Sequence, residues 1–269
     1  MAAQPRRRLD VELLRRKLVR SRQEAQSLIE QHRVTVDGLP ANKAARQVLP
    51  GAAISIASGD VAYASRGAHK LLGALAAFAG DDFPDLTGLR ALDAGASTGG
   101  FTDVLLRRGV AQVIAVDVGY GQLVWELQQD HRVTVMDRTN VRHLEVADLP
   151  YRPDLIVSDL SFISLTKVIP ALGQLPTTPG HMLLMVKPQF ELSKAQVGNN
   201  GVVRDPELRA LATTTVSQAA ADLGWGTRAV AASPLPGPAG NVEYFLWLSR
   251  GGAAASADRI AEVVAQGPQ

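Results

Sequence analysis

The sequence predicts an α/β fold: a doubly wound, Rossmann-like sheet with a last antiparallel strand, preceded by a small α+β unit. From residue 90 onward, short apolar runs alternate with helical stretches, which is the pattern of a parallel sheet covered by helices. Residues 1–50 carry eleven Lys/Arg against five Asp/Glu, whereas the remainder carries 17 against 21. We therefore expect a basic front part joined to a mildly acidic body.

The basic front part contains signals for two helices and two strands. A first helix is predicted by leucines at helical spacing: Leu9, Leu13, Leu14 and Leu18. Ser21 and Glu24 have the spacing of a capping box, which begins a second helix. The segments Arg33–Val36 and Ala53–Ile56 predict strands. Such a unit suits a polyanion-binding module, and a solubilising surface helix is the alternative.

In the body, five apolar runs predict buried strands: Arg90–Leu92, Val113–Val116, Val133–Val135, Leu155–Val157 and Met182–Val186. Helices are expected over residues 71–78, 101–108, 121–129, 164–174 and 206–223. A further run, Val242–Leu248, follows a proline-rich loop and is expected to be the antiparallel strand. The tail is expected to be flexible, with a short helix over 257–265.

Several classes of protein are excluded by what the sequence lacks. It has no cysteine, which removes disulfides, thiolate metal sites and a cysteine nucleophile. No apolar run approaches the roughly 18 residues of a membrane helix, and no apolar segment follows the N-terminal arginines as in a secretory signal. No cluster of histidines and carboxylates has metal-ligand spacing. We expect a soluble, cytoplasmic protein, monomeric, with no membrane partner and no metal.

A glycine-rich turn follows the first strand of the body. Glycines there let the backbone bend sharply and let a ligand approach the main chain. The motif is not the dinucleotide fingerprint G-x-G-x-x-G, because position 97 is serine. The carboxylate of Asp93 would repel a pyrophosphate, but it suits the cationic amino-acid end of S-adenosylmethionine. A nicotinamide-dependent oxidoreductase is the main alternative, and ordinary turn and cap residues are another.

Acidic residues also end the next two strands. Asp117 is placed to hold ribose hydroxyls, and Asp137 is placed to reach an adenine edge. The predicted cofactor-binding residues are Asp93, Gly95, Ala96, Ser97, Thr98, Gly99, Gly100, Phe101, Asp117, Asp137 and Asp159.

Four polar residues are expected to converge at one edge of the sheet. Asp159 and Lys187 follow the fourth and fifth strands, and Glu243 begins the last one, which reaches the same edge if it is antiparallel. Lys70 begins the helix before the first strand. Two lysines and two carboxylates suit the deprotonation of a weak acid such as a ribose hydroxyl, since a desolvated lysine beside another cation can act as a base. A structural ion pair is the alternative.

Two features that the sequence lacks bear on which group would accept a methyl group at such a site. Enzymes that methylate a nucleobase amino group commonly have an Asn/Asp-Pro-Pro-aromatic turn after the fourth strand, whereas this chain has Asp159-Leu-Ser-Phe162. Methylation of carbon 5 of a pyrimidine needs a cysteine nucleophile, which is absent. A ribose hydroxyl is therefore favoured.

Several long motifs resemble one family: SRGAHK from Ser65, DAGASTGGFTDVLL from Asp93, VDVGYGQL, SDLSFISL, VKPQFE and PLPGPAGNVEYFLWL. They resemble the TlyA family of ribosomal RNA 2′-O-methyltransferases, whose members are also labelled haemolysins. The resemblance covers nearly the whole chain. It implies an S4-type RNA-binding domain over residues 1–60, a linker over 61–64, an FtsJ-like methyltransferase domain over 65–250 and a tail over 251–269.

The resemblance also implies a function and a catalytic tetrad. The tetrad falls on Lys70, Asp159, Lys187 and Glu243, and the cofactor is S-adenosylmethionine. The implied acceptor is a cytidine ribose in small-subunit and large-subunit ribosomal RNA, and loss of the family's activity gives resistance to capreomycin-like antibiotics. One departure is the linker, where Val61-Ala62-Tyr63-Ala64 replaces an Arg-x-Trp-Val pattern and puts a linker contribution to cofactor binding in doubt.

Basic side chains are the candidates for contact with ribosomal RNA or ribosomal subunits: Arg6, Arg7, Arg16, Arg20, Arg22, Lys43, Arg66 and His69. Phe162 or Tyr120 is a candidate for stacking on a base, with a place in the core as the alternative. A membrane-active haemolysin and a non-catalytic S4-type RNA-binding protein are the alternative functions. The first needs a membrane-spanning or exposed amphipathic segment, and the only suggestive one, Leu71–Ala79, is short.

Overall fold

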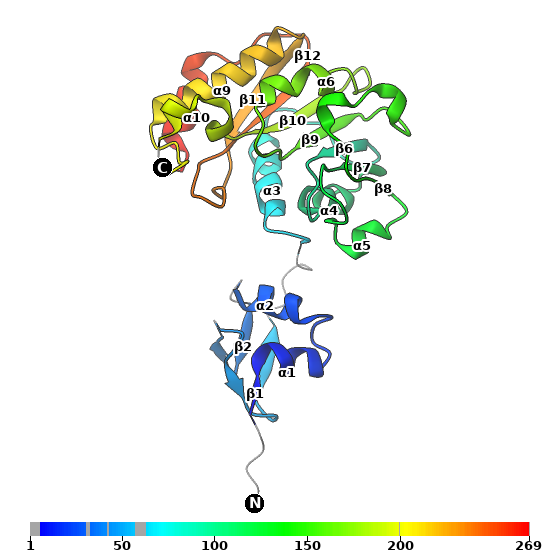
Figure 1. Cartoon of the computed structure of the whole chain (residues 1–269), viewed down its shortest axis with the longest axis vertical. Coiled ribbons are helices and arrows are strands. Elements are labelled where there is room, and N and C mark those ends of the chain that lie inside the picture. Colours follow the sequence, from blue (N-terminus) through cyan, green and yellow to red (C-terminus); the bar gives the residue numbers. More distant parts are fainter. Residues whose placement is uncertain (1–5, 31–32, 42, 57–62, 199, 269) are drawn as a thin grey trace, which may run out of the picture. The chain divides into compact units, whose positions relative to one another are not determined.

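A computed structural model describes residues 6–30, 33–41, 43–56, 63–198 and 200–268. The chain divides into two compact units, the first ending at Ala62 and the second beginning at Tyr63 (Figure 1). Val61 and Ala62 of the expected linker lie outside the described residues, whereas Tyr63 and Ala64 belong to the second unit.

The first unit combines two helices with short strands. Its helices are α1 (Leu9–Arg15) and α2 (Arg22–Glu30), and its strands are β1 (Arg7–Arg8), β2 (Val34–Val36), β3 (Leu39–Pro40), β4 (Gln47–Val48) and β5 (Ile54–Ile56). Strand β2 pairs antiparallel with both β3 and β5, and β1 pairs with β4. The predicted cap is present in part, because the backbone N–H of Glu24 donates to Ser21 Oγ at 3.1 Å. The Glu24 carboxylate accepts instead from the backbone N–H of Arg20.

Two carboxylates are fully buried in this small unit and are held by arginines. Asp10 accepts from Arg8 and Arg22, and Glu12 accepts from Arg15 and other guanidinium groups. The hydrogen bond from Arg15 lowers the pKa of Glu12 to about 2. Buried carboxylates need such partners, since an unpaired charge in the interior is costly. Arginines of the basic front part therefore bind buried carboxylates of the same unit as well as contributing to its surface.

The second unit is built on a seven-stranded sheet in the order β11-β12-β10-β9-β6-β7-β8. The strands are β6 (Arg90–Ala94), β7 (Gln112–Val116), β8 (Val133–Met136), β9 (Leu155–Ser158), β10 (His181–Val186), β11 (Trp225–Ala232) and β12 (Tyr244–Arg250). Five neighbouring strands, from β10 to β8, run parallel, and β12 is antiparallel to both β10 and β11. The predicted doubly wound sheet with an antiparallel strand is thus confirmed. The sequence prediction missed β11, whose Gly226 and three alanines are weak strand formers.

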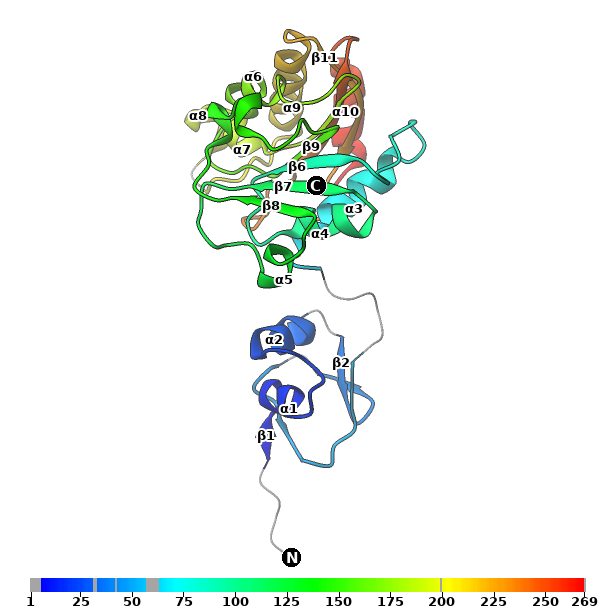
Figure 2. The same ribbon diagram turned by 90° about the vertical axis from the view of Figure 1, so that its right-hand side faces the viewer.

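Helices cover both faces of this sheet (Figures 1 and 2). One face carries α3 (Gly67–Phe78), α4 (Gly100–Arg107) and α5 (Trp125–Gln128), and the other carries α6 (Ile169–Leu172), α9 (Pro206–Ala221) and α10 (Ala257–Gln266). Short helices lie in the connections: α7 (Pro188–Glu191), α8 (Lys194–Val197), η1 (Val141–His143), η2 (Val146–Asp148) and η3 (Leu165–Lys167). Each face therefore has its own apolar core, with the sheet between them.

Two helices differ from the sequence prediction and a third agrees with it. The helix expected over 121–129 is only α5, since Gly121 has a left-handed φ of +63°. The helix expected over 164–174 is broken into η3 and α6, with Pro170 in the first turn of α6. The short helix expected over 257–265 is present as α10, which packs on α9 through the buried Ile260 and Val264. No helix in the described ranges is long and apolar enough to cross a membrane.

Packing between α3 and the loop before β12 requires a glycine. A Cβ added at Gly73 would overlap the ring of Pro234, whereas one added at Gly80 would meet nothing within 4 Å. We expect Gly73→Ala to lower the free energy of unfolding by about 1–2 kcal/mol, because overpacking outweighs the gain in helix propensity. Chemical denaturation checks this, with Gly80→Ala as the control. Equal stabilities of the two variants would contradict it.

Candidate active site

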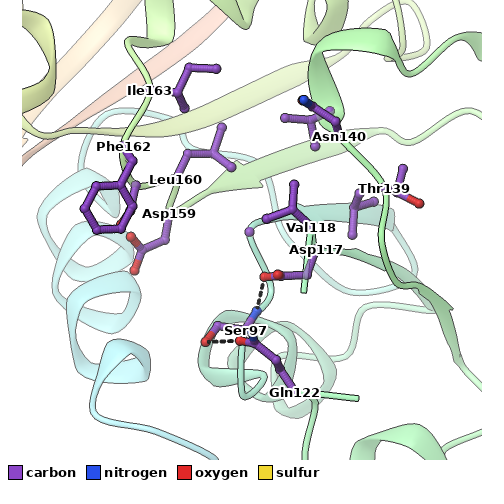
Figure 3. A pocket seen from close by; sticks show the side chains of 14 residues that line it. Ser97, Asp117, Val118, Gln122, Thr139, Asn140, Asp159, Leu160, Phe162 and Ile163 are labelled. Atoms are coloured by element: carbon purple, nitrogen blue, oxygen red, sulfur yellow. Dashed lines mark hydrogen bonds between the residues drawn. The ribbon is translucent and has the colours of Figure 1, made fainter. Parts of the chain in front are cut away.

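A cavity of about 480 Å³ lies at the carboxyl ends of β6, β7 and β9 (Figure 3). Its wall combines apolar and polar residues, and the polar ones are Ser97, Asp117, Gln122, Thr139, Asn140, Asp159 and Ser161. The apolar lining residues are Val116, Val118, Val141, Leu160, Phe162 and Ile163. Ligands bind at this edge of doubly wound sheets, because the loops after parallel strands leave a crevice there. The cavity therefore lies at the edge of the sheet where the sequence predicts a ligand site.

The glycine turn forms one end of the cavity. Gly95 has a left-handed φ of +89°, and a Cβ there would lie 2.7 Å from the backbone oxygen of Asp159. The backbone N–H of Ser97 donates to Asp117 Oδ2 at 2.8 Å, and the N–H of Gly119 donates to Asp117 Oδ1 at 2.7 Å. Asp117 therefore ties the turn after β6 to the loop after β7 and remains part of the cavity wall (Figure 3).

A second cavity of about 310 Å³ adjoins the first. The two share four wall residues, which are Gly95, Ser97, Asp159 and Ser161. The rest of the second wall comes from the start of α3, the glycine turn, the residue after β10 and the loop before β12: Ser65, Arg66, Gly67, Lys70, Ala96, Thr98, Gly100, Phe101, Lys187 and Pro238. A ligand in one cavity therefore borders a ligand in the other.

The four predicted tetrad residues form two ion pairs at the second cavity. Lys187 Nζ lies 2.6 Å from Asp159 Oδ1, and Lys70 Nζ lies 2.5 Å from Glu243 Oε2. Both lysine side chains are at least nine-tenths buried, yet both line the cavity. Pairing of Val186 with Tyr244 in the antiparallel register brings Glu243 beside this edge. The convergence predicted from strand ends is therefore present.

Glu243 is enclosed by the loop that precedes it. Its Oε1 is buried and has no hydrogen-bond partner among the described residues. A Cβ at Gly237 would lie 2.7 Å from that oxygen, so the loop closes over the carboxylate only because Gly237 has no side chain. Asn241 fixes the same loop, since its side chain accepts from the backbone N–H of Val203 and donates to the backbone oxygen of Gly201.

Asp93 is not on the wall of either cavity. It lies inside β6, is fully buried, and accepts a hydrogen bond of 2.7 Å from Thr102 Oγ1. Burial raises its pKa to about 7. The expectation that Asp93 contacts a cofactor directly therefore has no support in its position, because alternation along the strand turns this side chain into the interior.

Two other predicted cofactor residues also lie away from the cavity walls. The Asp137 carboxylate accepts from the backbone N–H of Gly121 at 2.9 Å and thereby ties the loop after β8 to the loop after β7. Gly99 has a left-handed φ of +99°, and a Cβ there would collide with Leu123 and Leu127. Gly99 thus serves the packing of the turn.

Some residues of the cavities were missed by the sequence reasoning. Thr139 and Asn140 line the first cavity just after β8, and Gln122 lines it from the loop after β7. Ser161 lines both cavities. Asp117 and Asp159 could be predicted because each directly follows a strand. The four missed residues lie two or more positions beyond a strand end, where the path of the loop decides whether a side chain reaches the cavity.

The candidate RNA contacts in the first unit differ in how far they are free to bind. The exposed candidates are Arg6, Arg7, Arg20, Arg22 and Lys43. Arg16 instead donates to the backbone oxygens of Pro50 and Ala52 at 2.7 Å and to Glu12, so its role in this unit is structural. Arg22 bonds Asp10 at 3.0 Å and Arg20 lies 3.5 Å from Glu24.

Arg66 and His69 are exposed at the start of α3, one turn or less from Lys70. The His69 ring lies edge-on to the Tyr63 ring, with 5.8 Å between the ring centres. The Arg107 guanidinium lies 4.2 Å from the centre of the same Tyr63 ring. The backbone N–H of Ala64 donates to Asp103 at 2.9 Å. The chain is therefore anchored on α4 directly before it enters the site.

Comparison with known proteins follows the division into two units. The S4 domain model matches residues 7–54, and the FtsJ-like methyltransferase model matches residues 63–250. The chain belongs to the FtsJ-like methyltransferase family. The predicted S4-type domain and the predicted enzyme class are both confirmed.

Relatives of this FtsJ-like methyltransferase carry two kinds of name. It is 54% identical over 244 residues, 90% of each chain, to the Mycobacterium tuberculosis protein named 16S/23S rRNA (cytidine-2′-O)-methyltransferase TlyA. It is 34% identical to the Brachyspira hyodysenteriae protein named hemolysin A, over 83% of this chain and 92% of that one. A solved hemolysin-named structure from Streptococcus thermophilus is 36% identical, with a TM-score of 0.75, and covers 98% of this chain and 96% of that chain. The resemblance to the TlyA family is confirmed.

The buried Asp93 makes stability depend on pH. Its folded-state pKa of about 7 lies above its ordinary value of 3.8, so the neutral acid favours folding fully below pH 3.8. This contribution is lost as the pH rises towards 7, at a cost of at most roughly 4 kcal/mol. We expect Asp93→Asn to lose less stability than the wild type between pH 4 and pH 7. Urea denaturation at several pH values measures this, and parallel curves for the two proteins would exclude it.

Proposed function

We propose that this methyltransferase transfers a methyl group from S-adenosylmethionine to the 2′ oxygen of a cytidine ribose in the ribosomal RNA of both subunits. The observation that carries the proposal is the pair of lysine–carboxylate contacts, Lys187–Asp159 and Lys70–Glu243, beside the glycine turn. The nature of the RNA is taken from the name of the M. tuberculosis relative. The hemolysin names of other relatives describe a different activity, and the lysine–carboxylate pairs favour methyl transfer.

The first cavity has the donors and shape for the nucleoside part of the cofactor. Asp117 offers carboxylate oxygens to ribose hydroxyls, and the apolar walls from Val118 and Ile163 suit an adenine ring. Gly95 leaves the space that any side chain would fill. When bound, S-adenosylmethionine supplies an electrophilic methyl group on a sulfonium that is already a good leaving group. Positioning is therefore most of what the protein must add.

The second cavity has the groups that a ribose hydroxyl requires. In the transfer, a bond forms between the ribose oxygen and the methyl carbon as the carbon–sulfur bond breaks, and the hydroxyl proton must leave. That proton passes to the nitrogen of Lys70 or Lys187 in its neutral amine form, which becomes an ammonium, and the carboxylates keep each lysine in place. No group of three or more His, Asp or Glu side chains in the described part of the chain could hold a metal ion. The proposed reaction uses no metal ion.

Aromatic and basic side chains beside the cavities suit a nucleotide. Phe162 is 91% exposed and Tyr120 is 71% exposed, so neither is a core residue. The Phe162 ring lies 5.3 Å from the Phe190 ring, and both line a groove with Arg142 and Lys167. Exposed aromatic rings can stack on bases that leave the RNA helix, and S4-type domains supply phosphate contacts. This combination favours folded RNA as the acceptor.

The proposal is tested by methyl transfer to ribosomal RNA. We expect Lys187→Ala to lower the single-turnover rate by at least about 100-fold, since removal of a proton-transfer group costs 10²–10⁴-fold. Cofactor affinity should stay within about twofold, because Lys187 lines only the second cavity. Tritium transfer from labelled cofactor and calorimetry measure the two quantities. Lys194→Ala, an exposed lysine on α8, is the matched control. An active Lys187→Ala enzyme would refute the assignment.

RNA binding should depend on the exposed cations of the first unit. We expect Lys43→Ala to weaken binding and to reduce the slope of log affinity against log salt by about 0.7–0.9, the value for one lost phosphate contact. Filter binding at several salt concentrations measures this slope. Lys194→Ala should leave it unchanged, whereas an unchanged slope in Lys43→Ala would remove that residue from the RNA footprint.

The proposed modification also bears on drug sensitivity. Because it adds a methyl group to ribosomal RNA, we propose that it alters the response of the ribosome to capreomycin-like antibiotics, as the family resemblance implies.

A further inference from the structure

The Lys187 ammonium has two acceptors, and only one of them belongs to the tetrad. Its Nζ lies 2.6 Å from Asp159 Oδ1 and donates to Ser161 Oγ at 2.9 Å. An ammonium carries three N–H groups. Two are occupied by these acceptors, and the lysine lines the second cavity. The remaining position on the nitrogen, which carries the lone pair when the lysine is a neutral amine, is therefore the one available to an acceptor hydroxyl.

The Ser161 hydroxyl is held in place by a rigid loop. Phe162, the next residue, has a left-handed φ of +64°, which a bulky residue adopts only when the surroundings impose it. Glu191 of α7 fixes the far end of the loop, because its carboxylate accepts from Ser164 Oγ at 2.5 Å and from the backbone N–H of Leu165 at 2.8 Å. The loop after β9 is thus tied to the segment that carries Lys187.

Ser161 also lies where the two cavities meet. It is one of the four residues that line both. Its side chain is exposed rather than packed in a core, so its hydroxyl is not needed to satisfy a buried group elsewhere. The position therefore combines a direct hydrogen bond to the lysine with a place between the methyl donor and the acceptor.

We propose that Ser161 is a positioning residue for Lys187: with Asp159 it fixes the nitrogen so that its third position, where the neutral amine carries the lone pair, faces the hydroxyl of the acceptor. The inference rests on the proposed function, in which that oxygen belongs to a ribose. It predicts that the hydroxyl, rather than the volume of the serine side chain, matters. Threonine at this position keeps the hydroxyl, whereas alanine removes it.

The contact itself is tested without RNA. In the full-length protein labelled with ¹⁵N-lysine, we expect Ser161→Ala to speed the exchange of the Lys187 ammonium protons with water by about tenfold, the factor for one hydrogen bond to a charged group. The Lys187 signal is assigned by its loss in Lys187→Arg. Ser161→Thr should restore slow exchange. Ser164→Ala, which loosens the same loop at Glu191, should change this exchange less than Ser161→Ala does. Equal exchange in Ser161→Ala and the wild type overturns the inference.

The consequence for the reaction is tested by single-turnover methyl transfer to ribosomal RNA. We expect Ser161→Ala to lower the rate at saturation by about tenfold or more, with unchanged RNA affinity, and Ser161→Thr to recover most of it. A lower RNA affinity with a normal rate at saturation overturns the positioning role. A wild-type enzyme that labels no ribosomal RNA would instead refute the proposed function, and the proton exchange would still decide the contact between Ser161 and Lys187.

Discussion

Antiparallel pairing of β12 with β10 is the constraint on which the candidate active site depends. A parallel strand in this position would begin at the opposite edge of the sheet and would carry Glu243 away from Lys70. The observed register pairs Val186 with Tyr244, so Lys187 and Glu243 lie just beyond the same cross-strand pair. Each buried lysine then has a carboxylate from a different strand or loop within ion-pair distance, which offsets the cost of burying its charge.

The same need for compensation shapes the first unit. Asp10 and Glu12 are fully buried, and arginines from β1, α1 and α2 surround them. A guanidinium has five N–H donors, so it can bind an internal carboxylate and still present donors outward. Arg16 shows the limit of this arrangement, because two backbone oxygens and Glu12 use its donors. The count of basic residues in the sequence therefore overstates the charge that RNA can contact.

Much of the fold and part of the site could be predicted from the sequence. The parallel strands were found because their apolar runs are continuous, whereas β11 was hidden by Gly226 and its alanines. Asp117, Asp159 and Lys187 were found because topology alone gathers the carboxyl ends of parallel strands. Asp93 lies one residue before the end of β6, where alternation reverses the direction of the side chain. The contacts of Ser161 and Asn140 with the cavity depend on the paths of their loops, which the hydrophobic periodicity of the sequence does not predict.

The two adjoining cavities have a thermodynamic consequence, since Gly95, Ser97, Asp159 and Ser161 border both. Whichever molecule arrives first displaces water from these residues. The second molecule then meets a wall that is already partly dehydrated, so its own binding has less water to displace. The coupling has the same size in both directions, because linkage between two binding equilibria is reciprocal. A shared wall thus favours the complex that holds both reactants over the two complexes that hold only one.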